Sequence, residues 1–365
     1  MKKPIIWIIV LVVVIIGLWI GMSKNTEDPS GAVLKIGGAL PLTGVYASFG
    51  EEFRRGAEIA QEEINNGGEK VKVIFEDSVI EAKKSVDAVT KLLTFDKIDA
   101  LFVSSYIEAA ATHDIVAKKN IPMLVLWDSN PQIEEMGDKV FAIGPWTPAS
   151  GEISASFIYE KGLRRVSIFG FKEKWSTAVS EAFNKKFIEL GGTITTKEFA
   201  NPDAKDYRTE LSKAIKSNPD AIYMTTQDMQ KGIRQLKELG FKGMIVSSDI
   251  LDNEQISLQP ALFEGVYQSQ VADPETKKTS DYINLYKKKY GENPKKLLYG
   301  TWGYDAVHML YEAYKDSANH DITAELYKIK HAGASGDISF DEKGTSKTIP
   351  KMFIVKNGII TRVSE

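Results

Sequence analysis

The chain has 365 residues, of which 43% are hydrophobic and 26% are charged, so it can bury the cores of about two domains. It contains no cysteine, which excludes disulfide bonds, thiolate metal sites and a cysteine nucleophile. The formal net charge of -3 argues against a nucleic-acid binder, and the four histidines lack the i, i+4 spacing of a metal site.

The N-terminal segment is apolar throughout. Residues 4–22 follow Lys2 and Lys3 and contain no charged side chain. As a helix they would span about 28 Å, close to the thickness of the hydrocarbon core of a bilayer. We therefore predict a membrane anchor over residues 1–23, with the lysines in the cytoplasm and the remaining chain outside. A signal peptide cleaved near Ser23 is the alternative, and it gives a secreted or periplasmic protein.

The next segment, residues 24–32, is polar and is predicted to be a flexible linker. From residue 33 onward, short apolar segments alternate with amphipathic ones. Strands are predicted at 33–40, 71–75, 99–104, 121–126 and 140–143. Helices are predicted between them at 51–66, 82–93 and 108–119. Buried strands joined by helices indicate a parallel sheet that is covered on both faces.

The same alternation starts again at residue 152. Helices are predicted at 152–161, 175–190, 206–217 and 229–239, and strands at 166–169, 193–199, 221–225 and 244–246. The last hundred residues are predicted to contain strands at 266–269, 337–340 and 351–355, and helices at 278–290, 303–315 and 324–331. The predicted fold class is therefore α/β, with two doubly wound parallel-sheet lobes, and the chain crosses back at its end to complete lobes begun earlier.

The sequence shows no catalytic motif. It has neither a Gly-rich dinucleotide or phosphate loop nor a Gly-x-Ser-x-Gly nucleophile. Adjacent carboxylates such as Glu51 and Glu52 would diverge on a helix and so form no acid–base pair. We therefore predict that the protein is not an enzyme and uses no cofactor or metal.

Loops that follow strands are the candidate binding segments, because ligands of open α/β sheets bind at the carboxyl ends of the strands. The candidate ligand-binding residues on these loops are Phe49, Ser105, Tyr106, Trp127, Ser129, Trp175, Gln227 and Asp249. Serines and free N–H groups at helix N-termini suit a carboxylate, and Asp249 suits an ammonium group. Alternatively, the serines are helix caps, Asp249 belongs to an Asx turn, and the aromatic rings are core residues.

Several segments after residue 33 together match the pattern of one family. They are LKIGGALPLTGVYASFGEEFRRGAEIAQEEINNGG, the strand at 72–77, IPMLVLWDSNPQI, WGYDAVHMLYEA and GDISFDEKG. The sequence resembles the branched-chain amino-acid-binding (Leu/Ile/Val-type) solute-binding proteins of ABC transporters. The resemblance implies the type I periplasmic binding protein fold, in which two lobes trap a ligand between them. It implies hinge crossings near 144–147, 271–273 and 345–349. The implied lobes are 33–146 with 273–347, and 147–272 with 348–365.

The resemblance also implies a role for each candidate residue of the first lobe. Phe49 takes the place of the family's first-loop aromatic residue. The carboxylate-binding serine falls on Tyr106 or, with a shift of one position, on Ser105. Trp127 falls on a backbone donor and Ser129 on a hydroxyl donor. Because Tyr106 and Trp127 are bulky, the pocket is expected to be smaller than is usual in the family or to stack on a flat ligand.

In the second lobe, Trp175 falls on an aromatic position of the family and Asp249 on the acid that holds the ligand's amino group. Gln227 lies where the family often has a tyrosine. The resemblance implies an extracytoplasmic receptor of an ABC import system, which captures an amino acid or a similar zwitterionic ligand and delivers it to a membrane permease. We expect a monomer that binds no nucleic acid. The alternative function is the ligand-binding sensor subunit of a signalling system.

Overall fold

The structure is a computed structural model that describes residues 33–127, 129, 131–248, 251–317, 321–346 and 348–363. The predicted membrane anchor at 1–23 and the linker at 24–32 lie outside these residues. Within the described ranges, no helix is both long enough and apolar enough to cross a bilayer. Membrane anchoring therefore stays a prediction.

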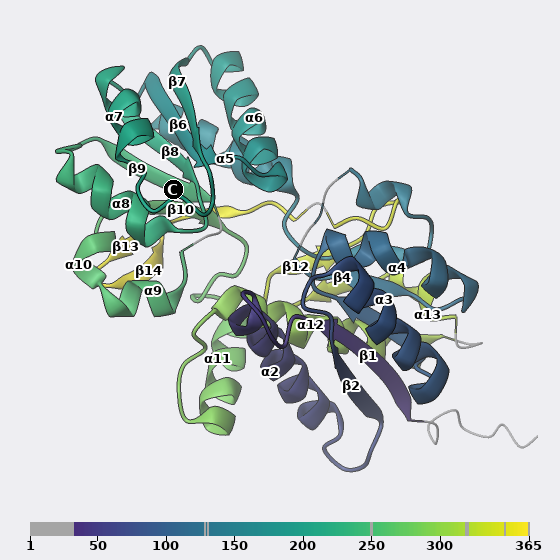
Figure 1. Ribbon diagram of the computed structural model, residues 1–365. Coiled ribbons are helices and arrows are strands. Elements are labelled where there is room, and N and C mark those ends of the chain that lie inside the picture. Colours follow the sequence, from purple (N-terminus) through teal and green to yellow (C-terminus); the bar gives the residue numbers. More distant parts are fainter. Residues whose placement is uncertain are drawn as a thin grey trace, which may run out of the picture. The chain divides into compact units, whose positions relative to one another are not determined.

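The first sheet contains five parallel strands in the order β2-β1-β3-β4-β5. The strands are β1 (Leu34–Leu40), β2 (Val71–Asp77), β3 (Ala100–Val103), β4 (Met123–Val125) and β5 (Val140–Ala142). Helices α2 (Ala47–Ile64) and α12 (Leu297–Asp316) cover one face, and α3 (Ala82–Lys91) and α4 (Tyr106–Lys118) cover the other (Figure 1). On β3, Phe102 packs in the core with α2 and α12, whereas Leu101 and Val103 pack in the core with α3 and α4.

We call this sheet with its helices the first lobe. It is completed by α11 (Lys277–Tyr290), α13 (Ile322–Leu326), the short helical turns η2 (Leu92–Asp96) and η3 (Ile133–Glu135), and a small antiparallel pair, β11 (Lys330–Ala332) and β12 (Asp337–Ser339). Strands that are apolar on both faces thus form here for the reason predicted, because helices cover both faces of the sheet.

Helices α2 and α12 approach each other closely at two glycines. A Cβ atom on Gly56 would lie 1.9 Å from the carbonyl oxygen of Gly300, and one on Gly303 would lie 2.0 Å from that of Phe53. Only residues without a side chain fit at these positions. The close contact places the first turn of α12 beside α2, and the ring of Tyr299 lies 5.5 Å from that of Phe53.

The second sheet has seven strands in the order β14-β13-β10-β9-β8-β6-β7. They are β6 (Arg165–Phe171), β7 (Thr193–Ala200), β8 (Ala221–Thr225), β9 (Met244–Ser248), β10 (Tyr267–Gln270), β13 (Lys351–Lys356) and β14 (Ile359–Arg362). Helices α5 (Thr147–Glu160) and α6 (Lys174–Glu189) pack on one face, and α7 (Arg208–Lys216) and α8 (Met229–Glu238) pack on the other. The short helices α9 (Asn253–Leu258) and α10 (Pro260–Phe263) follow β9. We call this sheet with its helices the second lobe.

The second sheet is mixed, because β13 pairs antiparallel with β10 and with β14. β13 and β14 form a hairpin whose two-residue turn, Asn357-Gly358, has φ angles of 52° and 72°. Asn-Gly is the preferred sequence for a turn with two positive φ angles. The two strands of a hairpin are necessarily antiparallel to each other. The predicted parallel arrangement is correct for the core strands and wrong for β13, and β14 was not predicted.

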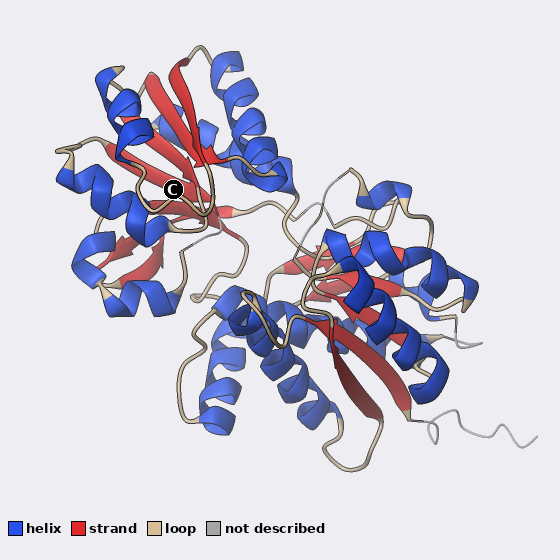
Figure 2. Cartoon of the chain, viewed as in Figure 1, coloured by secondary structure: helices blue, strands red, loops and turns tan. Residues whose placement is uncertain are grey.

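Within the described residues, the chain passes between the two sheets three times. The passages lie between β5 and α5, between β10 and α11, and between β12 and β13. Both sheets belong to one compact unit that begins at Leu34. Figure 2 shows that each lobe alternates strands with helices, although each is built from separate stretches of sequence.

Candidate ligand-binding site

An aromatic cluster, formed by Tyr46, Phe49, Trp127 and Tyr299, lies at the carboxyl edge of the first sheet. The rings of Phe49 and Trp127 stack with their centroids 5.1 Å apart and an interplanar angle of 28°. Tyr299 meets both rings edge-on, at 4.8 Å from Phe49 and 5.2 Å from Trp127. The Tyr46 ring lies 6.1 Å from that of Trp127. The structure thus brings together two predicted site residues and adds two that the sequence analysis missed.

The loop between β1 and α2, which leads to Phe49, is held by Asp77 at the end of β2. Asp77 Oδ1 accepts hydrogen bonds from the backbone N–H groups of Leu42 at 2.9 Å and Thr43 at 3.3 Å. Burial favours the neutral acid, but hydrogen bonds from the Thr43 hydroxyl and the loop N–H groups outweigh it and lower the pKa of Asp77. The charged carboxylate therefore fixes the loop that leads into α2, whose first turn carries Phe49.

The loop between β3 and α4 carries Ser105 as the N-cap of α4 and Tyr106 as its first residue. The N–H of Ser105 donates to Oε2 of the buried Glu108 at 2.7 Å, and the hydroxyls of Ser104 and Ser78 donate to the same carboxyl group. Burial outweighs these hydrogen bonds and raises the pKa of Glu108 to about 7. Ser105 therefore occupies the capping position that the sequence analysis considered as the alternative to ligand binding.

Trp127 and Ser129 follow β4, and the chain itself uses their polar groups. The N–H of Trp127 donates to the carbonyl oxygen of Ser104 at 2.8 Å. Ser129 is fully buried, and its Oγ donates to the carbonyl oxygen of Ser346 at 3.2 Å. The Ser129 carbonyl oxygen accepts a hydrogen bond from the N–H of Thr147 at 3.0 Å. Ser129 thereby joins the loop after β4 to two of the passages between the lobes.

The predicted residues of the second lobe follow strands β6, β8 and β9, which are neighbours in the sheet. Trp175 lies in the first turn of α6 and packs, partly buried, against the core that contains Val179. Gln227 is exposed between β8 and α8, and Asp249 lies outside the described residues. Glu173, which the prediction omitted, has a buried Oε1 atom without a hydrogen-bond partner among the described residues, and burial raises its pKa.

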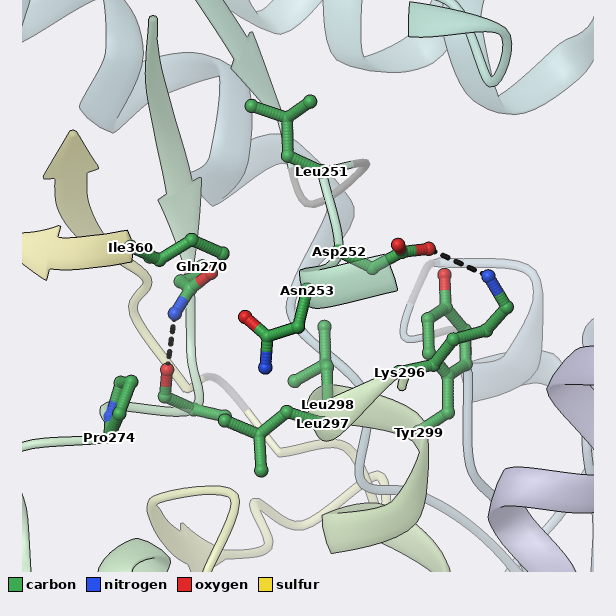
Figure 3. Close-up of a pocket in the computed structure, with 11 residues that line it drawn as sticks. Leu251, Asp252, Asn253, Gln270, Pro274, Lys296, Leu297, Leu298, Tyr299 and Ile360 are labelled. Atoms are coloured by element: carbon green, nitrogen blue, oxygen red, sulfur yellow. Dashed lines mark hydrogen bonds and ion pairs between the residues drawn. The ribbon is translucent and has the colours of Figure 1, made fainter. Parts of the chain in front are cut away.

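A cavity of about 30 Å³ lies where the start of α12 meets the segment between β9 and α9 (Figure 3). This volume holds on the order of two water molecules. Its lining comes from both lobes and includes Asp252, Gln270, Lys296 and Tyr299. The Lys296 Nζ atom lies 4.7 Å from the centroid of the Phe49 ring, so the cavity adjoins the aromatic cluster. Lys296 and Tyr299 were not predicted as site residues, because the sequence pattern places both in a loop before the predicted helix at 303–315.

The chain forms two α/β lobes joined by three chain passages. Loops of the kind that bind ligands in open α/β sheets lie at the carboxyl edges of both sheets. This combination defines a two-lobed binding protein. Residues 33–357 match the family described as "Periplasmic binding protein". The Leu/Ile/Val-binding protein homolog 1 of Brucella abortus (strain 2308) is 26% identical over 329 residues, which cover 86% of this chain and 87% of that protein.

Solved structures show the same fold. The leucine binding protein LivK from Thermotoga maritima has a TM-score of 0.80 and 30% sequence identity, and the match covers 91% of this chain and 98% of that one. The substrate binding protein LivJ from Streptococcus pneumoniae, in complex with isoleucine, has a TM-score of 0.81 and 21% identity, and the match covers 92% of this chain and 100% of that one.

The chain belongs to the periplasmic binding protein family, and its fold is the type I periplasmic binding protein fold. It is a solute-binding protein of the branched-chain amino-acid ABC transporter type. Proteins of this family act outside the cytoplasm and are not enzymes. The predictions of the family and of a non-enzymatic function are therefore confirmed.

Proposed function

We propose that the protein captures an amino acid or a similar small carboxylate between its two lobes and delivers it to the permease of an ABC import system. Family membership supports the general activity. The relatives support the class of ligand, because one is named for leucine and another was crystallised with isoleucine. The loops at the carboxyl edges of the two sheets are the proposed contact surfaces.

The aromatic cluster is the observation that carries this proposal. Phe49, Trp127 and Tyr299 place three rings at the sheet edge where ligands of open α/β sheets bind. Binding pockets of this kind are mostly apolar, with a few polar groups that orient the ligand. We infer that the hydrocarbon or aromatic part of the ligand packs on these rings. Bulky Tyr106 and Trp127 extend the proposed ligand class to flat aromatic carboxylates.

The other predicted residues supply the polar and closing contacts in this proposal. Ser105 receives the ligand carboxylate at the N-terminus of α4, where the helix dipole favours an anion. Ser129, whose hydroxyl donates to the carbonyl oxygen of Ser346 in this structure, offers its oxygen lone pairs to the ligand from the neighbouring loop. Asp249 pairs with the ligand's ammonium group, and Trp175 and Gln227 contact the ligand from the second lobe.

The proposed mechanism is a rotation of the two lobes about the three chain passages. We place the lobe boundaries at 33–146 with 273–347 and at 147–272 with 348–365. A ligand that contacts both lobes favours the arrangement in which both sets of contacts form together. This coupling converts binding into a change of shape that a permease can recognise.

The proposed location is the outer face of the membrane that holds the permease, with residues 4–22 as the anchor and the protein acting as a monomer. Fractionation of cells that express the full chain, or a chain that starts at residue 24, tests the anchor. We expect the full chain in the membrane fraction and the shortened chain outside it. Light scattering tests the monomer, and we expect it to give the mass of one chain.

A thermal-unfolding screen of the full-length protein tests ligand capture. Leucine, isoleucine, valine, phenylalanine and benzoate form the panel, and a ligand that binds the native state raises the melting temperature. We expect at least one to do so and Trp127→Ala to weaken its binding about tenfold, the equivalent of losing about 1.4 kcal/mol of aromatic contact. Phe95→Ala is the control, because Phe95 is 82% exposed. If no member shifts the melting temperature, the proposed ligand class is wrong.

A further inference from the structure

An ion pair joins the two lobes beside the aromatic cluster (Figure 3). Lys296, the N-cap of α12 in the first lobe, places its Nζ atom 2.7 Å from Oδ2 of Asp252, the N-cap of α9 in the second lobe. The two side chains are only 7% and 8% exposed. A backbone contact runs alongside, because the N–H of Glu254 donates to the carbonyl oxygen of Lys295 at 3.2 Å. The start of α9 thus contacts the residues just before α12.

Because the Lys296–Asp252 ion pair is buried, its stability depends closely on the distance between the two charges and on their other hydrogen bonds. Charges removed from water are tolerated only where close contacts and further hydrogen bonds replace their hydration. Asp252 Oδ1 accepts a hydrogen bond from the N–H of Gln255 at 2.8 Å. The Lys296 ammonium also lies 3.5 Å from the Glu254 carboxylate and 4.7 Å from the centroid of the Phe49 ring. Moving the two segments apart breaks this contact, so the pair favours the relative position of the segments in which both charges are satisfied.

Both partners adjoin residues of the proposed binding site. Lys296 lies less than one helical turn before Tyr299, and its ammonium is at cation–π distance from Phe49. Asp252 lies three residues after Asp249, the proposed partner of the ligand's ammonium group. The ion pair therefore connects the aromatic cluster of the first lobe to the start of α9 in the second lobe.

Two glutamines connect the same segment to the second passage between the lobes. The Gln268 side chain accepts from the N–H of Leu251 at 3.0 Å and donates to its carbonyl oxygen at 3.3 Å. Gln268 also donates to Gln270 Oε1 at 2.7 Å, and Gln270 donates to the carbonyl oxygen of Ala272 at 2.6 Å. A movement of the lobes about the residues that follow β10 is thereby linked to the segment that carries Asp252.

We propose that Lys296 and Asp252 are positioning residues, whose ion pair aligns the segment after β9 with the aromatic cluster and holds the two lobes in the arrangement that accepts the ligand. Neither side chain has to touch the ligand in this role. The effect on ligand binding rests on the proposed function, whereas the effect on the lobes requires no ligand and is measured without one.

Energy transfer between dyes on the two lobes of the full-length protein tests the proposal. Because the chain has no cysteine, Lys83→Cys on α3 and Lys185→Cys on α6 give two exposed labelling positions, one in each lobe. The test variant is Lys296→Met combined with Asp252→Asn, which removes both charges while the asparagine side chain can still accept the hydrogen bond from the N–H of Gln255.

The control removes an ion pair that lies within one lobe. Lys197 and Glu181 are 2.9 Å apart on β7 and α6, and Lys197→Met with Glu181→Leu removes both charges in the same way. A further variant, Lys296→Arg, keeps the positive charge and should retain the wild-type distribution of transfer efficiencies. Thermal unfolding confirms that each labelled protein is folded.

We expect the double variant to give a shifted and broader distribution of transfer efficiencies, and the control to match the wild type. With a ligand found by the screen, the apparent dissociation constant should rise at least about threefold in the double variant, because fewer molecules are competent to bind. Lys296→Arg should keep both properties of the wild type.

A folded double variant with the wild-type distribution would overturn the proposal. So would a Lys296→Arg protein that keeps the distribution but loses the affinity, because that result means contact with the ligand. If only the ligand screen fails, the proposed function is contradicted. The role of the ion pair is then decided by the ligand-free comparison of transfer efficiencies between the wild type and the double variant.

Discussion

Glu108 is a fully buried carboxyl group that ties together the loops after β2 and β3. It accepts hydrogen bonds from the hydroxyls of Ser78 and Ser104 and from the N–H of Ser105. Glutamine has nearly the same shape and serves all three groups, because its amide oxygen accepts from Ser104 and Ser105 while its NH₂ group donates to the Ser78 hydroxyl. Glu108→Gln therefore removes an ionisable group and little else.

The pKa of Glu108 determines how strongly the unfolding free energy of the wild type depends on pH. Burial raises the pKa of Glu108 from 4.5 to about 7. Between these pH values the folded protein keeps a proton that the unfolded chain has lost, so the free energy of unfolding falls as the pH rises through this window. The difference in pKa corresponds to about 3 kcal/mol of unfolding free energy lost by the wild type. The glutamine variant has no proton to lose at this position and should escape the loss.

Urea unfolding of both proteins at about pH 5 and about pH 7.5 measures this effect. Relative to wild type, we expect Glu108→Gln to gain about 2–3 kcal/mol of unfolding free energy between the two pH values. Glu69→Gln, at an exposed position, is the control and should gain nothing. Titrating groups elsewhere are common to all three proteins and cancel. A wild-type-to-variant difference that stays constant with pH would refute the reasoning.

Two further variants test other parts of the structure. Burial opposes the charge of His331, but hydrogen bonds to Asp305 at 3.4 Å and Glu312 at 3.1 Å outweigh it and raise its pKa to about 9. Its stabilising contribution is therefore complete below about pH 6.5 and is lost as the pH rises through 9, so His331→Gln should flatten that part of a melting-temperature profile. Gly56→Ala would place a methyl group 1.9 Å from a carbonyl oxygen of α12, and we expect a loss of more than about 1 kcal/mol in unfolding free energy although alanine is the better helix former. Ser48→Ala, at an exposed position of the same helix, is its control, and a Gly56→Ala protein as stable as wild type would contradict the close helix contact.

Apolar periodicity predicts the core strands but misplaces features that depend on tertiary contacts. The helix predicted at 303–315 in fact begins at Leu297. Gly300 and Gly303 lower the helix propensity of its first turns, so local sequence does not predict them as helical, yet the close approach of α2 requires glycine there. The prediction also omits β14, whose four residues are too few for a clear periodicity. The Asn-Gly turn before β14 was the available signal for it.

Some residues of the candidate site could be predicted from local sequence, whereas others depend on tertiary contacts. Phe49 and Trp127 were accessible from sequence because each follows a strand of the first sheet, and strand ends meet at one edge. Tyr299 and Lys296 follow no strand of that sheet, since the chain has returned from the second lobe before α12 begins. Their place beside Phe49 depends on the packing of α12 against α2, which local patterns do not encode.

Capture of a ligand between two lobes is tested most directly by energy transfer during a titration. Dyes on Lys83→Cys and Lys185→Cys report the separation of the lobes while the ligand that raises the melting temperature is added to the full-length protein. If the lobes close on the ligand, a second population with a distinct transfer efficiency appears, and its fraction follows the binding curve measured by calorimetry, with the same midpoint. A complete binding curve without any change in transfer efficiency would contradict capture between the lobes.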